Sequence, residues 1–73
     1  MSVMDIFAER IKLLREERGL GVREAAAMMG ISHSALSMYE NKKRTPDIEI
    51  CNLFADFYGV SGDYLLGRTN ERR

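Results

Sequence analysis

The sequence predicts an all-α fold, with five helices and no strands in a single domain. Apolar residues recur at the three- and four-residue spacing of helices, for example at Val22, Ala25, Ala26 and Met29. Serines stand where helices would begin and glycines where they would end. A chain of 73 residues makes one domain with a small core, because at this size only about 60% of the unfolded surface is buried on folding.

The first two helices are expected over residues 4–18 and 22–29. Ser2 and Asp5 resemble a capping box before the first helix. Its core stripe consists of Phe7, Ile11 and Leu14. Gly30 ends the second helix, because glycine enters a left-handed turn at little cost.

A third helix is expected over residues 33–41, with Ser32 as its N-cap. One face groups the apolar residues Ala35, Leu36 and Tyr39, and the opposite face groups His33, Ser34, Ser37 and Met38. Two short helices joined by a glycine turn, the second buried on one side and polar on the other, describe a helix-turn-helix. A helix exposed along one side fits the DNA major groove.

The fourth helix starts within Thr45-Pro46-Asp47, where either Thr45 or Asp47 can be the cap. It is expected to bury Cys51, Phe54, Ala55 and Tyr58 before Gly59 stops it. Ser61 caps a short fifth helix with Tyr64, Leu65 and Leu66. The folded domain is therefore expected over residues 1–67, and residues 68–73 form a polar tail that we expect to be flexible.

Several short motifs are spread along nearly the whole chain. They are Ile11, Leu14 and Arg15; Ala26; Gly30-Ile31-Ser32; Leu36-Ser37; Tyr39-Glu40; Pro46; Ala55; Gly59-Val60-Ser61; and Asp63-Tyr64-Leu65-Leu66-Gly67. Together they resemble the Xre/Cro-like helix-turn-helix family, which includes the phage repressors. The resemblance implies a compact five-helix, lambda-repressor-like domain. It also implies sequence-specific binding to double-stranded DNA, as a transcriptional regulator and usually a repressor, by a homodimer on a pseudo-palindromic operator.

The polar face of the third helix is the candidate base-reading surface. His33 can donate or accept at a base edge, Ser34 and Ser37 are adaptable hydrogen-bonding groups, and Met38 can pack on a thymine methyl. The central face carries no Arg, Gln or Asn. We therefore expect modest discrimination between bases or reliance on DNA shape.

Candidate phosphate contacts follow directly after that helix, at Asn41, Lys42, Lys43 and Arg44. The net charge of zero hides a local excess, since residues 22–46 carry four bases against two acids and residues 47–63 carry four acids and no base. The family usually begins its second helix with a serine or threonine and then glutamine, where this chain has Gly21 and Val22. Valine cannot replace the glutamine side chain, so no such contact is expected from Val22. Arg23, one residue further on, is the candidate phosphate contact in its place.

Glu40 stands at the carboxyl end of the third helix, where the helix dipole disfavours an anion. A cationic partner is therefore expected. Sequence alone leaves Lys42, Lys43 and plain solvation open as explanations. The family resemblance nominates Arg15, in a structural ion pair that fixes the reading unit on the first helix.

Composition excludes several other classes of protein. One cysteine and one histidine form no disulfide framework and no four-ligand zinc site, so we expect no metal and no cofactor. No apolar run approaches the roughly 20 residues of a membrane span and no signal-peptide pattern opens the chain, which predicts a soluble, cytoplasmic protein without a membrane partner. His33 has no evident catalytic partner, so neither an enzyme nor a small-molecule site is expected.

A different function remains open. Three features also fit a small protein-interaction module of an antitoxin-like or antirepressor-like kind. They are the neutral total charge, the acidic fourth helix, and a third-helix polar face without Arg, Gln or Asn. Salt-sensitive DNA binding favours the regulator. A co-purifying partner without DNA binding favours the interaction module.

Overall fold

The chain folds into five α-helices and no β-strand, which confirms the predicted fold class, and the computed structural model describes residues 1–73. In chain order the helices are α1 (Val3–Glu17), α2 (Val22–Met29), α3 (His33–Glu40), α4 (Ile48–Tyr58) and α5 (Gly62–Leu65). α1 lies one residue earlier than expected at both ends, and α3 ends one residue earlier. None of the five is long and apolar enough to cross a membrane.

Short polar side chains begin four of the helices. The Ser2 hydroxyl accepts the Asp5 N–H and the Asp5 carboxylate accepts the Ser2 N–H, so the predicted capping box is present at α1. Equivalent serine caps begin α3 and α5. At α4 the choice between Thr45 and Asp47 falls to Asp47, whose carboxylate accepts the Ile50 N–H at 2.8 Å.

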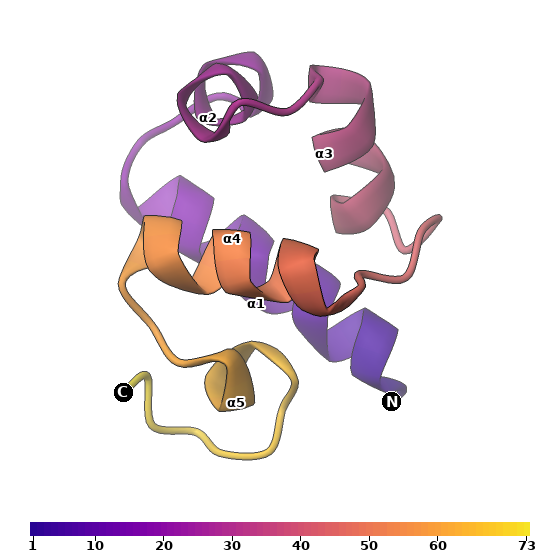
Figure 1. Cartoon of the computed structure of the whole chain (residues 1–73), viewed down its shortest axis with the longest axis vertical. Helices are drawn as coiled ribbons and strands as arrows, with labels where there is room; N and C mark the ends of the chain where they lie inside the picture. The colour runs from indigo at the N-terminus through magenta and orange to yellow at the C-terminus, as the bar shows by residue number, and fades with distance from the viewer.

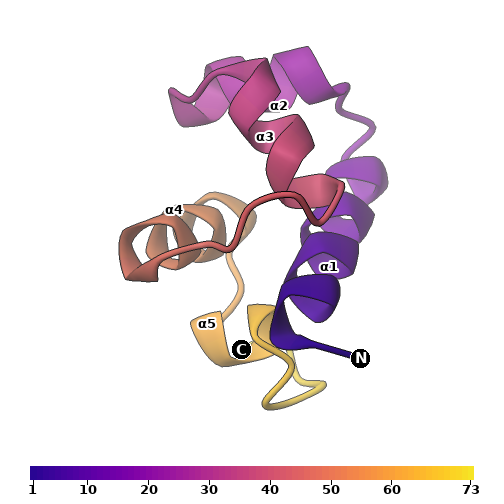
Figure 2. The same ribbon diagram turned by 90° about the vertical axis from the view of Figure 1, so that its right-hand side faces the viewer.

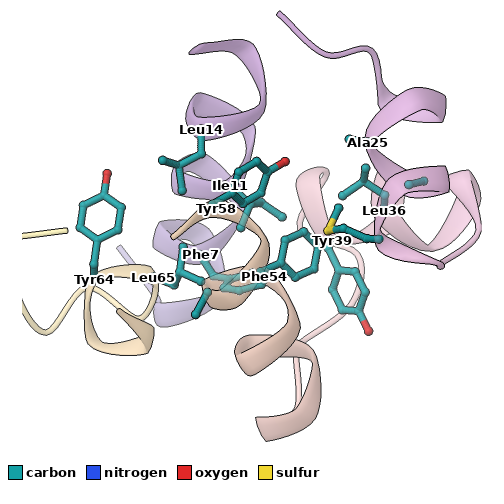
Figure 3. Packing of buried hydrophobic residues seen from close by; sticks show 13 residues of the cluster. Phe7, Ile11, Leu14, Ala25, Leu36, Tyr39, Phe54, Tyr58, Tyr64 and Leu65 are labelled. Carbon is teal, nitrogen blue, oxygen red and sulfur yellow. The ribbon is translucent and has the colours of Figure 1, made fainter. Parts of the chain in front are cut away.

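α1 and α4 cross near the centre of the molecule. α2 and α3 lie on one side of this crossing, and α5 lies on the opposite side (Figure 1). At the crossing, three buried rings from α1, α3 and α4 meet edge to face, as Figure 3 shows: Phe7, Tyr39 and Phe54. Their ring centroids lie 5.4–6.3 Å apart in pairs. Such pairs stabilise by about 0.5–1.5 kcal/mol beyond area burial, so this cluster helps to fix α3 on the scaffold.

The turn between α2 and α3 depends on small residues. Ala25 and Ala26 are fully buried, and their methyl groups leave room for α3 to pack closely on α2. Gly30 adopts a left-handed conformation with φ of 77°, and the next N–H, of Ile31, donates to the Ala26 carbonyl at 3.0 Å. This closed turn sets the angle at which α3 leaves α2.

The tail at residues 68–73 lies against α1 and α5. The Arg10 guanidinium of α1 donates to the Thr69 carbonyl at 2.7 Å. The Ser61 N–H at the start of α5 donates to the Arg72 carbonyl at 2.6 Å. These bonds attach the polar tail to the domain, while its mobility in solution stays a prediction.

Candidate nucleic-acid interface

α3 buries one side and exposes the other. Leu36 and Tyr39 point into the core, and α3 itself lies at the surface turned toward the viewer in Figure 2. The predicted base readers are all at least partly exposed on its outer side: His33, Ser34, Ser37 and Met38. Met38 is 36% exposed, and the Ser37 hydroxyl accepts a hydrogen bond from the Asn41 side chain at 3.0 Å. Ser37 and Asn41 therefore form one coupled polar group rather than two independent contacts.

The start of α2 leaves backbone donors free. Gly21 supplies no capping side chain, and its own N–H donates to the Glu24 carboxylate at 3.3 Å. The first-turn N–H groups of an α-helix have no intrahelical acceptor, and they carry the positive end of the helix dipole. Arg23 lies in this turn, exposed and without an ion-pair partner. This end of α2 therefore offers both backbone and side-chain donors to an anion.

The segment that follows α3 contains the other predicted phosphate contacts, and all four are exposed. Lys43 makes no ion pair, and the Arg44 guanidinium lies 5.8 Å from the centre of the Tyr39 ring without an acidic partner. Lys42 differs, because its Nζ lies 3.4 Å from Glu9 Oε2 and 3.9 Å from Asp5 Oδ1 on α1. The segment thus has two free cations and one already engaged within the chain.

Sequence reasoning missed the acids that hold Lys42. Asp5 and Glu9 are four residues apart, so they lie on one face of α1, and that spacing is a sequence signal for a shared cation. Nothing in the sequence places the segment after α3 against this face. The contact depends on the packing of α3 across α1.

The partner of Glu40 is Arg15 of α1. Arg15 Nε and Nη2 donate to the two carboxylate oxygens of Glu40 at 2.8 and 2.9 Å, and Nη1 donates to the Leu20 carbonyl at 2.7 Å. Both side chains are almost fully buried, with 11% and 5% exposed. The bonds to Glu40 raise the pKa of Arg15, against the opposing effect of burial. One guanidinium therefore joins α1, the turn before α2 and the end of α3.

An acidic groove of about 450 Å³ lies between the start of α4 and α5. Its apolar lining includes Pro46, Ile48, Cys51 and Leu66. Asp47 and Asp63 stand among the lining residues, and Ile48 is 80% exposed. No group of three or more His, Cys, Asp or Glu side chains in the chain is arranged to hold a metal ion.

Comparison with known proteins identifies a family. A family model described as helix-turn-helix matches residues 11–65. The HTH-type transcriptional regulator ImmR of Bacillus subtilis is 38% identical over 60 residues, which are 82% of this chain and 47% of that protein. The cryptic phage CTXphi transcriptional repressor RstR of Vibrio cholerae is 34% identical over 55 residues, covering 75% of this chain and 50% of the repressor.

A solved structure agrees with these sequence matches. The crystal structure of an HTH_3 family transcriptional regulator from Vibrio cholerae superposes with a TM-score of 0.77 at 25% identity, over 89% of this chain and 36% of that one. The chain spans about half the length of the two curated relatives and a smaller part of the solved structure.

Proposed function

The chain belongs to the HTH_3 helix-turn-helix family, and from this premise we propose that it is a sequence-specific, double-stranded DNA-binding transcriptional regulator. The observation that carries the proposal is the setting of α3. One side of this helix is fixed by the aromatic cluster and by the Arg15–Glu40 pair, and the other side is open to solvent. A helix presented in this way fits the major groove. The protein acts in the cytoplasm as a repressor by occupying an operator, without catalysis and without a cofactor.

The outer side of α3 reads the bases. His33 and Ser34 supply hydrogen-bonding groups, Met38 supplies an apolar contact for a thymine methyl, and Ser37 acts together with Asn41. Hydroxyl and thioether groups discriminate less than a bidentate Arg, Asn or Gln. Modest base selectivity with a contribution from DNA shape follows.

Phosphates are held on both sides of the reading helix. Arg23 and the free N–H groups of α2 contact one stretch of backbone, and Asn41, Lys43 and Arg44 contact another. The three cations among them predict that log K falls with log salt at a slope of about −2.7 per bound copy.

Two copies bind a pseudo-palindrome, with the C-terminal helices as the meeting surface. The exposed Ile48 beside the groove lined by Cys51 and Leu66 supports this assignment. Asp47 would face a like charge across such an interface, whereas Asp63 is paired with Arg68 at 3.7 Å. Salt should therefore strengthen dimer formation while it weakens DNA binding, and sedimentation equilibrium at two salt concentrations measures the first effect.

The acidic groove also supports a second candidate function, docking of a partner protein. In that case α3 would be a structural element and the groove the functional surface. The two candidates differ in what they bind and in how salt affects the binding.

A selection from a randomised duplex of about 30 base pairs, at two salt concentrations, tests the proposed function. We expect an enriched inverted repeat. Met38→Ala should then change the base preferred at one position of each half-site, whereas Met28→Ala, an exposed methionine on α2, is the matched control and should not. Salt-sensitive binding without enrichment would mean that the protein recognises the DNA backbone and DNA shape but not a base sequence. Absence of binding at low salt would overturn the regulator in favour of the docking module.

A further inference from the structure

Lys42 has an unusual backbone conformation. Its φ of 63° makes it the one residue other than glycine with a positive φ. The Lys42 N–H donates to the Tyr39 carbonyl and the Lys43 N–H donates to the Met38 carbonyl, which is the paired pattern that commonly ends a helix at glycine. A side chain in this conformation costs free energy that glycine would avoid. Contacts of the lysine side chain can offset part of this cost.

The contacts of Lys42 lie within the chain. Its Nζ is 3.4 Å from Glu9 and 3.9 Å from Asp5, both on the first turns of α1. A second contact joins the same two segments, because the Thr45 hydroxyl donates to the Met4 sulfur at 3.4 Å. Figure 2 shows the segment after α3 and the start of α1 on the same side of the molecule. Residues 41–45 are thus held on α1 at two points.

From this geometry we infer that Lys42 is a positioning residue and not a phosphate ligand. It ties the segment after α3 to Asp5 and Glu9, and so fixes the path of the backbone that carries Lys43 and Arg44. The inference rests on the proposed DNA binding, and it separates one lysine from neighbours of the same charge. Lys43 and Arg44 lack acidic partners and supply the phosphate contacts.

Electrostatics supports the separation. Lys42 already lies beside two carboxylates, so moving it to a phosphate exchanges one anion for another and leaves two acids unpaired near the DNA. A free lysine such as Lys43 gains a phosphate without that loss. Lys42 therefore acts through the loop it holds.

A thermal-unfolding cycle without DNA tests the positioning. Lys42→Ala keeps a residue with a Cβ at the strained position, so the backbone cost is unchanged, and the side chain beyond Cβ is lost together with its ammonium group. Glu9→Gln should lower Tm in the parent chain and leave it unchanged or slightly raise it in the Lys42→Ala background, where Asp5 and Glu9 repel each other. Glu16→Gln, an exposed α1 glutamate without an ion pair, is the matched control and should behave alike in both backgrounds. Equal effects of Glu9→Gln in both backgrounds would overturn the inference.

Salt titration of operator binding tests the role on DNA. Lys43→Ala should reduce the slope of log K against log salt by about one, as loss of a phosphate contact does. Lys42→Ala should change the slope far less than Lys43→Ala does and weaken binding at every salt concentration, by roughly twofold to fivefold, the scale of one exposed ion pair. Lys42→Arg should restore the affinity. A slope that falls as much in Lys42→Ala as in Lys43→Ala would make Lys42 a phosphate ligand.

The two experiments separate the inference from the proposed function. If the parent chain binds no DNA while the thermal cycle stays non-additive, the regulator assignment fails, and the result still supports Lys42 as the residue that positions the segment after α3. If DNA binding is strong and the cycle is additive, the regulator assignment stands and the positioning role fails.

Discussion

The molecule contains two bidentate arginine–glutamate pairs with the same chemistry and opposite surroundings. Arg15 and Glu40 join α1 to the end of α3, with N–O distances of 2.8 and 2.9 Å. Arg72 and Glu17 join the tail to the end of α1, with distances of 2.8 and 2.7 Å. The first pair is 11% and 5% exposed, and the second is 44% and 42% exposed. Both pairs are bidentate at similar distances, but Arg15 uses Nε and Nη2 and also binds the Leu20 carbonyl, whereas Arg72 uses Nη1 and Nη2. Solvent access is the larger difference between them.

Two ion pairs with similar hydrogen bonds can differ widely in what they contribute to stability. Water and salt compete for exposed charges, so a well-formed surface pair contributes little to stability. A buried charge that loses its partner has no water to replace it. The buried pair lies at the carboxyl end of α3, and the exposed pair lies at the tail. Loss of the pair that holds the end of α3 on α1 should therefore cost more stability than loss of the pair at the tail.

Arg15→Met should have the largest effect, because it leaves Glu40 buried beside an apolar side chain. We expect a loss of about 3–5 kcal/mol in the free energy of unfolding, the usual result of removing one member of a buried pair. Denaturant unfolding at pH 7 measures it. Arg72→Met is the matched control and should cost a small fraction of that loss. Similar losses in the two variants would show that burial does not distinguish the pairs.

Removing both members of the buried pair should restore much of the stability. In Arg15→Met with Glu40→Leu no charge is left unpaired, and apolar replacements of buried pairs are often neutral in stability. We expect the double variant to recover about 2 kcal/mol or more of the loss caused by Arg15→Met alone. Failure to recover would assign the loss to the bond with the Leu20 carbonyl, since Arg15 also makes that contact.

Tyr58→Phe probes the surroundings of the same pair. The Tyr58 hydroxyl is buried without a hydrogen-bond partner, and burial, followed by the nearby Glu40 carboxylate, raises its pKa to about 12. The phenol is therefore neutral at pH 7, and the substitution removes only an unsatisfied polar atom. We expect the free energy of unfolding to rise by about 1 kcal/mol in denaturant unfolding. A loss of stability would mean that the hydroxyl has a hydrogen-bond partner in solution.

Local features were predictable from the sequence, and contacts between distant segments were not. The capping serine and aspartate at Ser2 and Asp5, the left-handed Gly30 and the buried side of α3 follow from residue type and helical spacing. Each is decided within a few residues of the chain, where steric limits and unsatisfied N–H groups leave few alternatives.

The ion pairs needed information from outside the local sequence. Residue spacing left several partners open for Glu40, and only family resemblance favoured Arg15, 25 positions away. No pattern indicated that Lys42 would meet α1 or that Arg72 would meet Glu17. The partner of a long charged side chain depends on how the helices pack. That packing is determined by all the residues of the core together.

The exposed pair should give the smallest effect, visible as a pH dependence. The hydrogen bonds from Arg72 hold the pKa of Glu17 below its ordinary value of 4.5. A lowered pKa in the folded state means that the pair stabilises the fold above pH 4.5, and that this contribution is lost as pH falls below that value through the lowered pKa.

Thermal unfolding of the parent chain and of Glu17→Gln should therefore differ slightly at pH 7 and converge at low pH. Amide exchange at residues 68–73 adds the corresponding local measurement, because loss of the pair should speed exchange in the tail and leave α3 unchanged. If amide exchange in α3 also becomes faster, the tail is coupled to α3 through α1, and the two pairs do not act independently.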